Sequence, residues 1–383
     1  MNRLQELGTQ GQSVWLDYIR RQILNNGEFC RLVDEDGVAG VTSNPSIFEK
    51  AIAGSTDYTA ALEGLVGSGT VDPKAIYEAL AIDDIQAAAD ILRQVYDRTD
   101  GRDGFVSLEV SPTLANDTTG TIDEARRLWK AVGRDNLMIK VPATPEGIPA
   151  IRQLISDGIN INITLLFAVD MYEKVADAYM AGLDARTAAG ADVSRINSVA
   201  SFFVSRIDGV IDPKLAEKAA AATGAEELGR LTGLAGKAAI ANARLAYHRY
   251  LQISRSPHWQ ALAARGARTQ RLLWASTSTK NPAYRDVMYV EELIGADTVN
   301  TIPPATLDAF RDHGVIRASL EESPEGAAAT LRAIEAAGIS IRDVTTYLLV
   351  DGVKQFEVAF ARLLDAVAAK SSVVRQPFDS QSR

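Results

Sequence analysis

The chain has 383 residues, of which 46% are hydrophobic and 23% charged, and this composition is typical of a globular protein with a large buried core. Its 40 basic and 49 acidic residues give a net charge of -9 without a basic stripe, which argues against nucleic-acid binding. Cys30 is the single cysteine and the three histidines are isolated in sequence, so we expect neither a disulfide nor a metal site.

The N-terminal segment, residues 1–11, lacks the apolar run of a signal peptide. No later stretch reaches the ~18 consecutive apolar residues that a membrane-spanning helix needs. We therefore expect a cytoplasmic protein without a membrane partner.

Short apolar runs alternate with longer amphipathic segments along the chain. This order predicts repeated strand-helix units and hence a parallel sheet. Eight such units predict a closed (β/α)8 TIM barrel. The predicted strands are residues 14–17, 40–42, 105–110, 137–141, 159–165, 197–203, 271–276 and 298–302.

Helices are predicted between these strands, in two insertions and after the last strand. The amphipathic segments between strands are residues 122–132, 147–155, 169–188 and 235–251. Both long connections, 45–104 and 205–270, are expected to hold inserted helices, and in the first Asp72-Pro73 and Ile82-Asp83-Asp84 are typical helix starts. Residues 304–313, 324–337 and 341–369 predict three further helices, the last interrupted at Gly352. Because no linker divides the chain, we expect one barrel domain over residues 1–383, with C-terminal helices from about 315.

Lys140 lies inside the apolar run 136–142, which otherwise predicts a buried strand. Burial disfavours the ammonium form of a lysine, and the neutral amine is the nucleophile that attacks a carbonyl to form a Schiff base. Alternatively, the side chain lies along apolar surface and its charged end reaches water. The other strands bear on this choice.

Strand alternation places polar residues on one face of several strands. Ser107 and Glu109 share a parity opposite to that of the neighbouring aliphatic residues, as do Asn162 and Thr164. Lys140 and Ser201 have the same inward parity near the carboxyl ends of their strands, where barrel active sites lie. The predicted pocket contains Asp17, Asn44, Glu109, Lys140, Asn162, Thr164 and Ser201.

This set of side chains suits Schiff-base chemistry. A lysine amine that attacks a ketone forms a carbinolamine, which must lose water, and Glu109 with Thr164 can hold a water and move protons. Asp17 can act as the base that removes a proton from a substrate hydroxyl.

Each of these residues also has a structural interpretation. Asp17 can instead cap a helix that begins at Tyr18, and Glu109 can be the ion-pair partner of a buried Lys140. Asn44 and Asn162 can bind substrate hydroxyls or satisfy backbone groups at strand ends.

Basic residues follow two of the predicted strands. Arg206 comes after Ser201, and Lys280 lies in the loop that begins at Ser276. A guanidinium and an ammonium next to hydroxyl groups suit a phosphate. Alternatively, each is a solvated side chain at a helix start.

Four segments of this chain resemble the transaldolase family. Residues 40–48 (GVTSNPSIF) are similar to its N-terminal signature, and residues 138–148 (MIKVPATPEGI) are similar to the stretch that holds its Schiff-base lysine. Residues 158–167 (GININITLLF) and 201–206 (SFFVSR) also match, so the resemblance extends from Asp17 to about Pro304. The length and extra helices resemble the longer bacterial members.

The resemblance implies the role of each site residue. Lys140 would form the iminium, Asp17 would be the acid and base for bond cleavage and formation, and Glu109 with Thr164 would activate a water. No cofactor or metal is implied. The implied substrate-binding residues are Asn44, Asn162, Ser201, Phe203, Arg206, Ser276 and Lys280.

The implied reaction is the transfer of a dihydroxyacetone unit from sedoheptulose 7-phosphate to glyceraldehyde 3-phosphate, which gives erythrose 4-phosphate and fructose 6-phosphate. Many family members have an arginine in a shorter loop where this chain has Lys280. The phosphate role of that residue is therefore open, as is whether the protein is a monomer or a homodimer, and so are substrate breadth and the position of the C-terminal helix.

Two alternatives to a transaldolase remain. A fructose 6-phosphate aldolase resembles transaldolases but releases free dihydroxyacetone. Such aldolases have a tyrosine where this chain has Phe203, whose ring has no hydroxyl to position water, so transfer is favoured over hydrolysis. A non-catalytic sugar-phosphate-binding barrel would keep Arg206 and Lys280 but would not need Lys140, Glu109 and Asp17 together.

Overall fold

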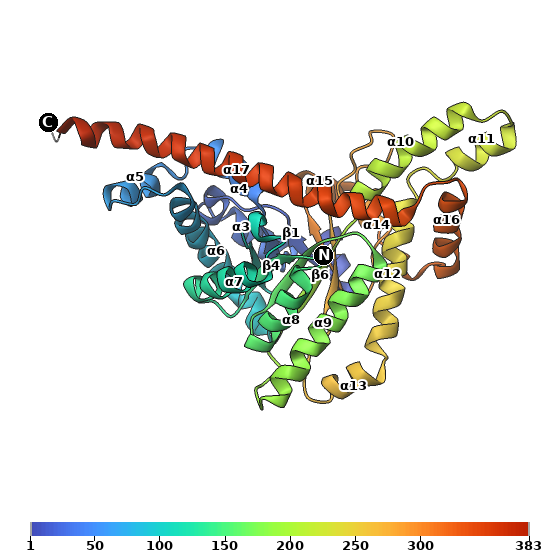
Figure 1. Ribbon diagram of the computed structural model, residues 1–383, viewed down its shortest axis with the longest axis horizontal. Coiled ribbons are helices and arrows are strands. Elements are labelled where there is room, and N and C mark those ends of the chain that lie inside the picture. Colours follow the sequence, from blue (N-terminus) through green and yellow to red (C-terminus); the bar gives the residue numbers. More distant parts are fainter. Residues whose placement is uncertain (1, 382–383) are drawn as a thin grey trace.

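The computed structural model describes residues 2–381 and contains a closed barrel of eight parallel strands in the order β1 to β8 (Figure 1). The predicted (β/α)8 TIM barrel is therefore confirmed, and all eight predicted strands form with bounds within two residues of those expected. The strands are β1 (Gln12–Leu16), β2 (Gly40–Thr42), β3 (Phe105–Glu109), β4 (Leu137–Pro142), β5 (Ile161–Leu166), β6 (Ser198–Phe203), β7 (Arg271–Ala275) and β8 (Thr298–Ile302).

Helices surround this barrel, and several are additions to the basic strand-helix plan. Two 3₁₀ turns, Pro112–Leu114 and Ser319–Glu321, lie among them. The helices are α1 (Arg3–Thr9), α2 (Arg21–Asn25), α3 (Glu28–Asp36), α4 (Pro45–Ala53), α5 (Thr59–Gly67), α6 (Pro73–Arg98), α7 (Thr118–Val132), α8 (Gly147–Asp157), α9 (Val169–Ala188), α10 (Ser205–Ala221), α11 (Ala225–Thr232), α12 (Ala238–Ser254), α13 (Pro257–Ala263), α14 (Met288–Glu291), α15 (Pro304–His313), α16 (Pro324–Ala336) and α17 (Ile341–Gln381).

Hydrogen bonds between non-neighbouring strands confirm the predicted inward face. Asn162 on β5 donates to Ser107 on β3, although β4 lies between these strands. Thr42 on β2 and Thr301 on β8 are also hydrogen-bonded, across β1. Side chains from non-adjacent strands can meet only inside the barrel, so residues of this parity point inward.

One predicted helix start is wrong. The segment Ile82-Asp83-Asp84 does not begin a helix but lies inside α6, which starts at Pro73 and is capped by Asp72 as expected. The buried Asp84 accepts hydrogen bonds from Arg21 at 2.7 Å and from the hydroxyl of Tyr58 at 2.8 Å. Asp84 thus links α6 to Arg21 and Tyr58. These contacts depend on the tertiary fold and cannot be read from a local capping pattern.

The predicted interruption at Gly352 is also wrong, because α17 is continuous through it. A methyl group at this position would lie 2.9 Å from Cδ2 of Leu165, so the glycine allows the helix to approach the end of β5 closely. In Figure 1, α17 runs along one side of the molecule from α16 to beyond α5. None of the helices within residues 2–381 is long and apolar enough to cross a membrane.

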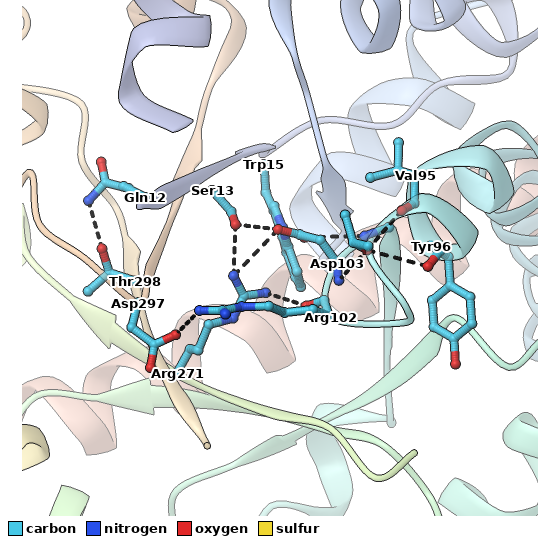
Figure 2. Close-up of polar contacts among 12 residues, drawn as sticks. Gln12, Ser13, Trp15, Val95, Tyr96, Arg102, Asp103, Arg271, Asp297 and Thr298 are labelled. Carbon is cyan, nitrogen blue, oxygen red and sulfur yellow. Dashed lines mark hydrogen bonds and ion pairs between the residues drawn. The ribbon is translucent and has the colours of Figure 1, made fainter. Parts of the chain in front are cut away.

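The N-terminal end of the barrel contains a cluster of mutually bonded polar side chains (Figure 2). Asp103 accepts from Nε1 of Trp15 at 2.7 Å and from the hydroxyl of Ser13. Arg271 donates to Ser13 at 2.7 Å, and its guanidinium lies 3.4 Å from Asp103. Both charged side chains are over 90% buried, and the cluster links β1 and β7 to the segment before β3 at the N-terminal end of the barrel.

Candidate active site

A cavity of about 850 Å³ opens at the C-terminal end of the barrel strands. Nine of the eleven predicted site residues line it. They are Asp17, Asn44, Lys140, Thr164, Ser201, Phe203, Arg206, Ser276 and Lys280. The other two, Glu109 and Asn162, are buried next to these residues.

Lys140 lies near the end of β4, with Glu109 of β3 and Asn162 of β5 as its neighbours in register. Its side chain is only 6% exposed, so the alternative in which its charged end reaches water is wrong. Nζ donates to the carbonyl oxygen of Ser43 at 2.8 Å and lies 3.4 Å from Oε2 of Glu109. A buried amine beside a cavity and a carboxylate can attack a carbonyl carbon that enters there.

Glu109 and Thr164 flank Lys140 with oxygens that lack hydrogen-bond partners. Among the described residues, neither Oε2 of Glu109 nor Oγ1 of Thr164 has one, although both are buried. Burial raises the pKa of the Glu109 carboxyl, and the nearby Lys140 opposes that rise only in part. The Lys140 amine, 3.4 Å from Oε2 of Glu109, is the charged group nearest to that oxygen. Buried oxygens without hydrogen bonds cost stability unless a water or substrate binds to them, so their position suits a bound reactant.

Asp17 directly follows β1, and its predicted alternative role as a helix cap is wrong. The next helix, α2, begins only at Arg21. The carboxylate accepts instead from the hydroxyl of Thr42 at 2.8 Å. Burial raises the pKa of Asp17, while the Thr42 hydrogen bond and the positive charge of Lys140 act in the opposite direction. The raised pKa makes Asp17 suitable for taking up and returning a proton.

Two threonines beside Asp17 were missed by the sequence interpretation. Thr42 and Thr301 line the cavity, and their hydroxyls are 2.6 Å apart. Thr42 has the same parity as the predicted Asn44, so strand alternation was a signal that could have identified it. Thr42 therefore holds Asp17 directly, and Thr301 of β8 contacts Thr42.

The two asparagines differ in their surroundings. Asn44 caps α4 by accepting from the amide of Ile47 at 3.0 Å, which confirms a backbone role, and it also lines the cavity. Asn162 is fully buried and donates to Ser107 at 3.0 Å, while its oxygen accepts from Ser201 at 2.6 Å. Asn162 therefore joins β3, β5 and β6 at the bottom of the cavity, beside Lys140.

Arg206 and Lys280, which lie in the segments after β6 and β7, supply positive charge to the cavity. The guanidinium of Arg206, in the first turn of α10, lies 5.2 Å from the ring centre of Phe203, and its buried Nη1 has no partner among the described residues. Burial lowers the pKa of Arg206, although Asp351 and Asp17 act against this shift. Arg206 does lie at a helix start, but it is only partly exposed, and its Nη1 is buried.

Lys280 is exposed at the cavity rim, and Nζ donates to Ser278 at 2.7 Å. Ser276 has a positive φ of 56°, a backbone conformation that non-glycine residues rarely adopt and that often marks functional loops. Its hydroxyl lies 3.0 Å from that of Ser205 at the start of α10. Hydroxyls, a lysine and an arginine therefore converge on one side of the cavity.

The C-terminal helix α17 covers part of the cavity, which answers a question that the sequence left open. Five of its residues are in the lining: Tyr347, Leu348, Asp351, Gln355 and Phe356. None was predicted as a site residue, because an amphipathic stripe indicates that a helix packs on a surface without identifying that surface. Within residues 2–381, no group of three or more His, Cys, Asp or Glu side chains is placed to hold a metal ion.

Comparison with known proteins gives consistent matches over nearly the whole chain. The model of a family described as transaldolase/fructose-6-phosphate aldolase matches residues 14–367. A transaldolase of Trichodesmium erythraeum is 48% identical over 372 residues, which covers 96% of this chain and 97% of that protein. Transaldolases of Thiobacillus denitrificans and Acidothermus cellulolyticus are 48% and 49% identical, each over 95% of this chain and over 99% and 95% of their own lengths.

Proposed function

Because this chain belongs to the transaldolase/fructose-6-phosphate aldolase family, we propose that it acts as a transaldolase and that Lys140 forms the Schiff base. In the proposed reaction, a dihydroxyacetone unit moves from sedoheptulose 7-phosphate to glyceraldehyde 3-phosphate. The products are erythrose 4-phosphate and fructose 6-phosphate. The observation that carries the assignment of the site is a buried Lys140 amine beside a cavity, with Glu109 on the neighbouring strand β3 and Asp17, which follows β1, in the lining of the same cavity.

The first half of the proposed reaction joins the donor to Lys140. The amine attacks the donor ketone and forms a carbinolamine, which loses its hydroxyl as water and becomes an iminium. Glu109 gives the proton that this hydroxyl needs to leave and later takes one back, and Thr164 holds the water. Their unpartnered oxygens support these roles.

The second half breaks and remakes a carbon-carbon bond. Asp17 takes the proton from the hydroxyl two carbons from the iminium, the adjacent carbon-carbon bond breaks, and its electrons pass into the iminium to give an enamine. The phosphorylated aldehyde leaves. The enamine carbon then attacks an acceptor aldehyde, Asp17 returns its proton to the new hydroxyl, and the iminium forms again. Water adds to this iminium, and the carbinolamine breaks down to the free ketose and the Lys140 amine.

Two features support the orientation of the substrate. Arg206 and Lys280 lie on one side of the cavity, with Ser276 between their elements, and can bind the phosphate through charge-assisted hydrogen bonds. Asn44 on the opposite wall can bind hydroxyls of the three-carbon unit. Phe203 packs against Phe167 and offers no hydroxyl to position water against the enamine, which favours transfer over hydrolysis.

The test is glyceraldehyde 3-phosphate release from fructose 6-phosphate, with and without erythrose 4-phosphate as acceptor. A transaldolase releases it steadily only when acceptor is present. Steady release without acceptor would make the protein an aldolase. A Lys140→Ala variant that keeps full activity would refute the role of Lys140, and Lys130→Ala, an exposed lysine on α7, is the matched control.

A further inference from the structure

The part of α17 that lies over the cavity brings a negative charge close to Arg206. Tyr347, Asp351 and Gln355 follow one another at intervals of four residues, so they lie on one face of the helix. All three line the cavity that contains Lys140 and Arg206. Among the described residues, Asp17 and Asp351 are the acidic residues of the lining, and Asp351 is the one that α17 contributes.

The helix backbone is close to Arg206 next to Asp351. Gly352 is buried, and a methyl group in its place would lie 3.7 Å from Nη1 of Arg206. Helices α10 and α17 pack against each other, so the position of the arginine is tied to that of Asp351. Burial lowers the pKa of Arg206, and the negative charge of Asp351 acts against that shift.

Asp351 does not form an ion pair with Arg206, however. Nε2 of Gln355, one turn further along α17, donates to the Asp351 carboxylate. Nη1 of Arg206 remains without a hydrogen-bond partner among the described residues. The arginine is therefore open to a phosphate, while a carboxylate is held at the same wall of the cavity.

We propose that Asp351 is a specificity-determining residue that limits the affinity of the Arg206 site for phosphate groups. This inference rests on the proposed function, in which Arg206 binds the substrate phosphate. A phosphate at Arg206 is repelled by the carboxylate across a partly buried space, where charges are less screened than in water.

A limited affinity has a use in this reaction. Donor, acceptor and both products all carry a phosphate, and each turnover must release one phosphorylated aldehyde and bind another. Phosphate contacts that are equally strong in every bound state do not speed the chemical step, and they slow release. The Asp351 carboxylate weakens these contacts without taking part in the bond changes.

The experiment compares Asp351→Asn with wild type in the full chain. We expect Asp351→Asn to bind inorganic phosphate about threefold to tenfold more tightly in isothermal titration, and to lower the KM for fructose 6-phosphate by a similar factor. The kcat should not rise. The matched control is Asp365→Asn, an exposed position roughly 21 Å further along the same helix at 1.5 Å per residue, which should change neither value.

Two outcomes would overturn this inference. Unchanged phosphate affinity in Asp351→Asn would mean that the carboxylate does not act on the site, and a higher KM would make it an acceptor for sugar hydroxyls. Arg206→Gln separates this result from a failure of the proposed function. If Arg206→Gln binds phosphate as tightly as wild type, the phosphate assignment itself is wrong; if it binds weakly while Asp351→Asn is unchanged, only the inference about Asp351 fails.

Discussion

At the N-terminal end of the barrel, Asp103 accepts hydrogen bonds from Trp15 and Ser13 and lies 3.4 Å from Arg271 (Figure 2). At the C-terminal end, Glu109 lies 3.4 Å from Lys140, and its Oε2 has no hydrogen-bond partner among the described residues. The two ion pairs have the same length and are similarly buried. They differ in their further contacts: each oxygen of Asp103 accepts a hydrogen bond from a neutral side chain, whereas among the described residues Oε2 of Glu109 has only the nearby Lys140 amine.

This difference separates structural from chemical roles. The buried atoms without partners next to the cavity include a carboxylate oxygen, a hydroxyl and a guanidinium nitrogen, on Glu109, Thr164 and Arg206. Outside the cavity, the described residues with such buried atoms include Gln12 and Gln270, through amide oxygens, and Arg244 and Arg249, through guanidinium nitrogens. A satisfied cluster stabilises the barrel, whereas charged atoms left open can bind and transform a ligand.

The largest effect is expected at the C-terminal end, for Lys140→Met. Activity should fall on the order of 10⁴-fold or more, because no other group can form the iminium. The thermal unfolding temperature should not fall, since methionine fills a similar volume without a buried charge. Steady-state assays and melting curves check this, with Lys130→Met as control. Activity within tenfold of wild type would contradict the assignment.

The opposite pattern is expected at the N-terminal end, for Asp103→Ala. Loss of this carboxylate leaves Arg271 buried without its charged neighbour, so the free energy of unfolding should fall by about 3 to 5 kcal/mol. The kcat of the folded protein should stay within about twofold. Urea unfolding measures the first quantity, and Asp135→Ala, whose side chain is 78% exposed, should change it little. A large loss of kcat without loss of stability would remove the distinction between the two ends.

Asp17→Asn should affect activity and stability in opposite directions. Activity should fall about 10²- to 10⁴-fold, because the base for bond cleavage is lost. Burial raises the folded-state pKa of Asp17 above 3.8, so wild type loses stability as the pH rises from about 3.8 through the folded-state pKa. The variant avoids this loss and should be more stable than wild type at pH 7 but not at pH 3. Unfolding curves at both pH values check the sign, with Asp123→Asn as an exposed control.

The smallest effect in this set is expected for Lys280→Gln, at the exposed rim of the cavity. The KM for fructose 6-phosphate should rise about tenfold with little change in kcat, since a solvated lysine contributes less than the buried Arg206. Lys214→Gln, on the outer part of α10, is the control. A KM equal to that of wild type would show that Lys280 does not replace the arginine found in many relatives of this family.

The barrel and the residues on its strands could be predicted from the sequence because strand geometry is periodic. Strand alternation predicts that Lys140, Glu109 and Thr164 lie on one face. The usual position of active sites in barrels predicts that they lie at the C-terminal end. The same rule applied to residues 40–44 would also have found Thr42.

The contribution of α17 could not be predicted in this way. Its stripe of apolar residues indicates that the helix is buried on one face, but not which surface it packs on. The sequence therefore does not indicate that Asp351 lies at the cavity. Gly352 was interpreted as a helix break because glycine disfavours helices locally, whereas the close approach to Leu165 decides its role. Similarly, Asp84 has the local pattern of a helix start, and its bonds to Arg21 and Tyr58 depend on the tertiary fold. That the barrel and its extra helices form one domain stays a prediction.

The most direct test of the account is to trap the iminium. The protein is incubated with fructose 6-phosphate and borohydride, which reduces an iminium to a stable amine, and the modified peptide is then identified by mass spectrometry. We expect one three-carbon adduct per chain, attached to Lys140. An adduct on another lysine, or no adduct in a protein that turns over its substrate, would contradict the central role of Lys140.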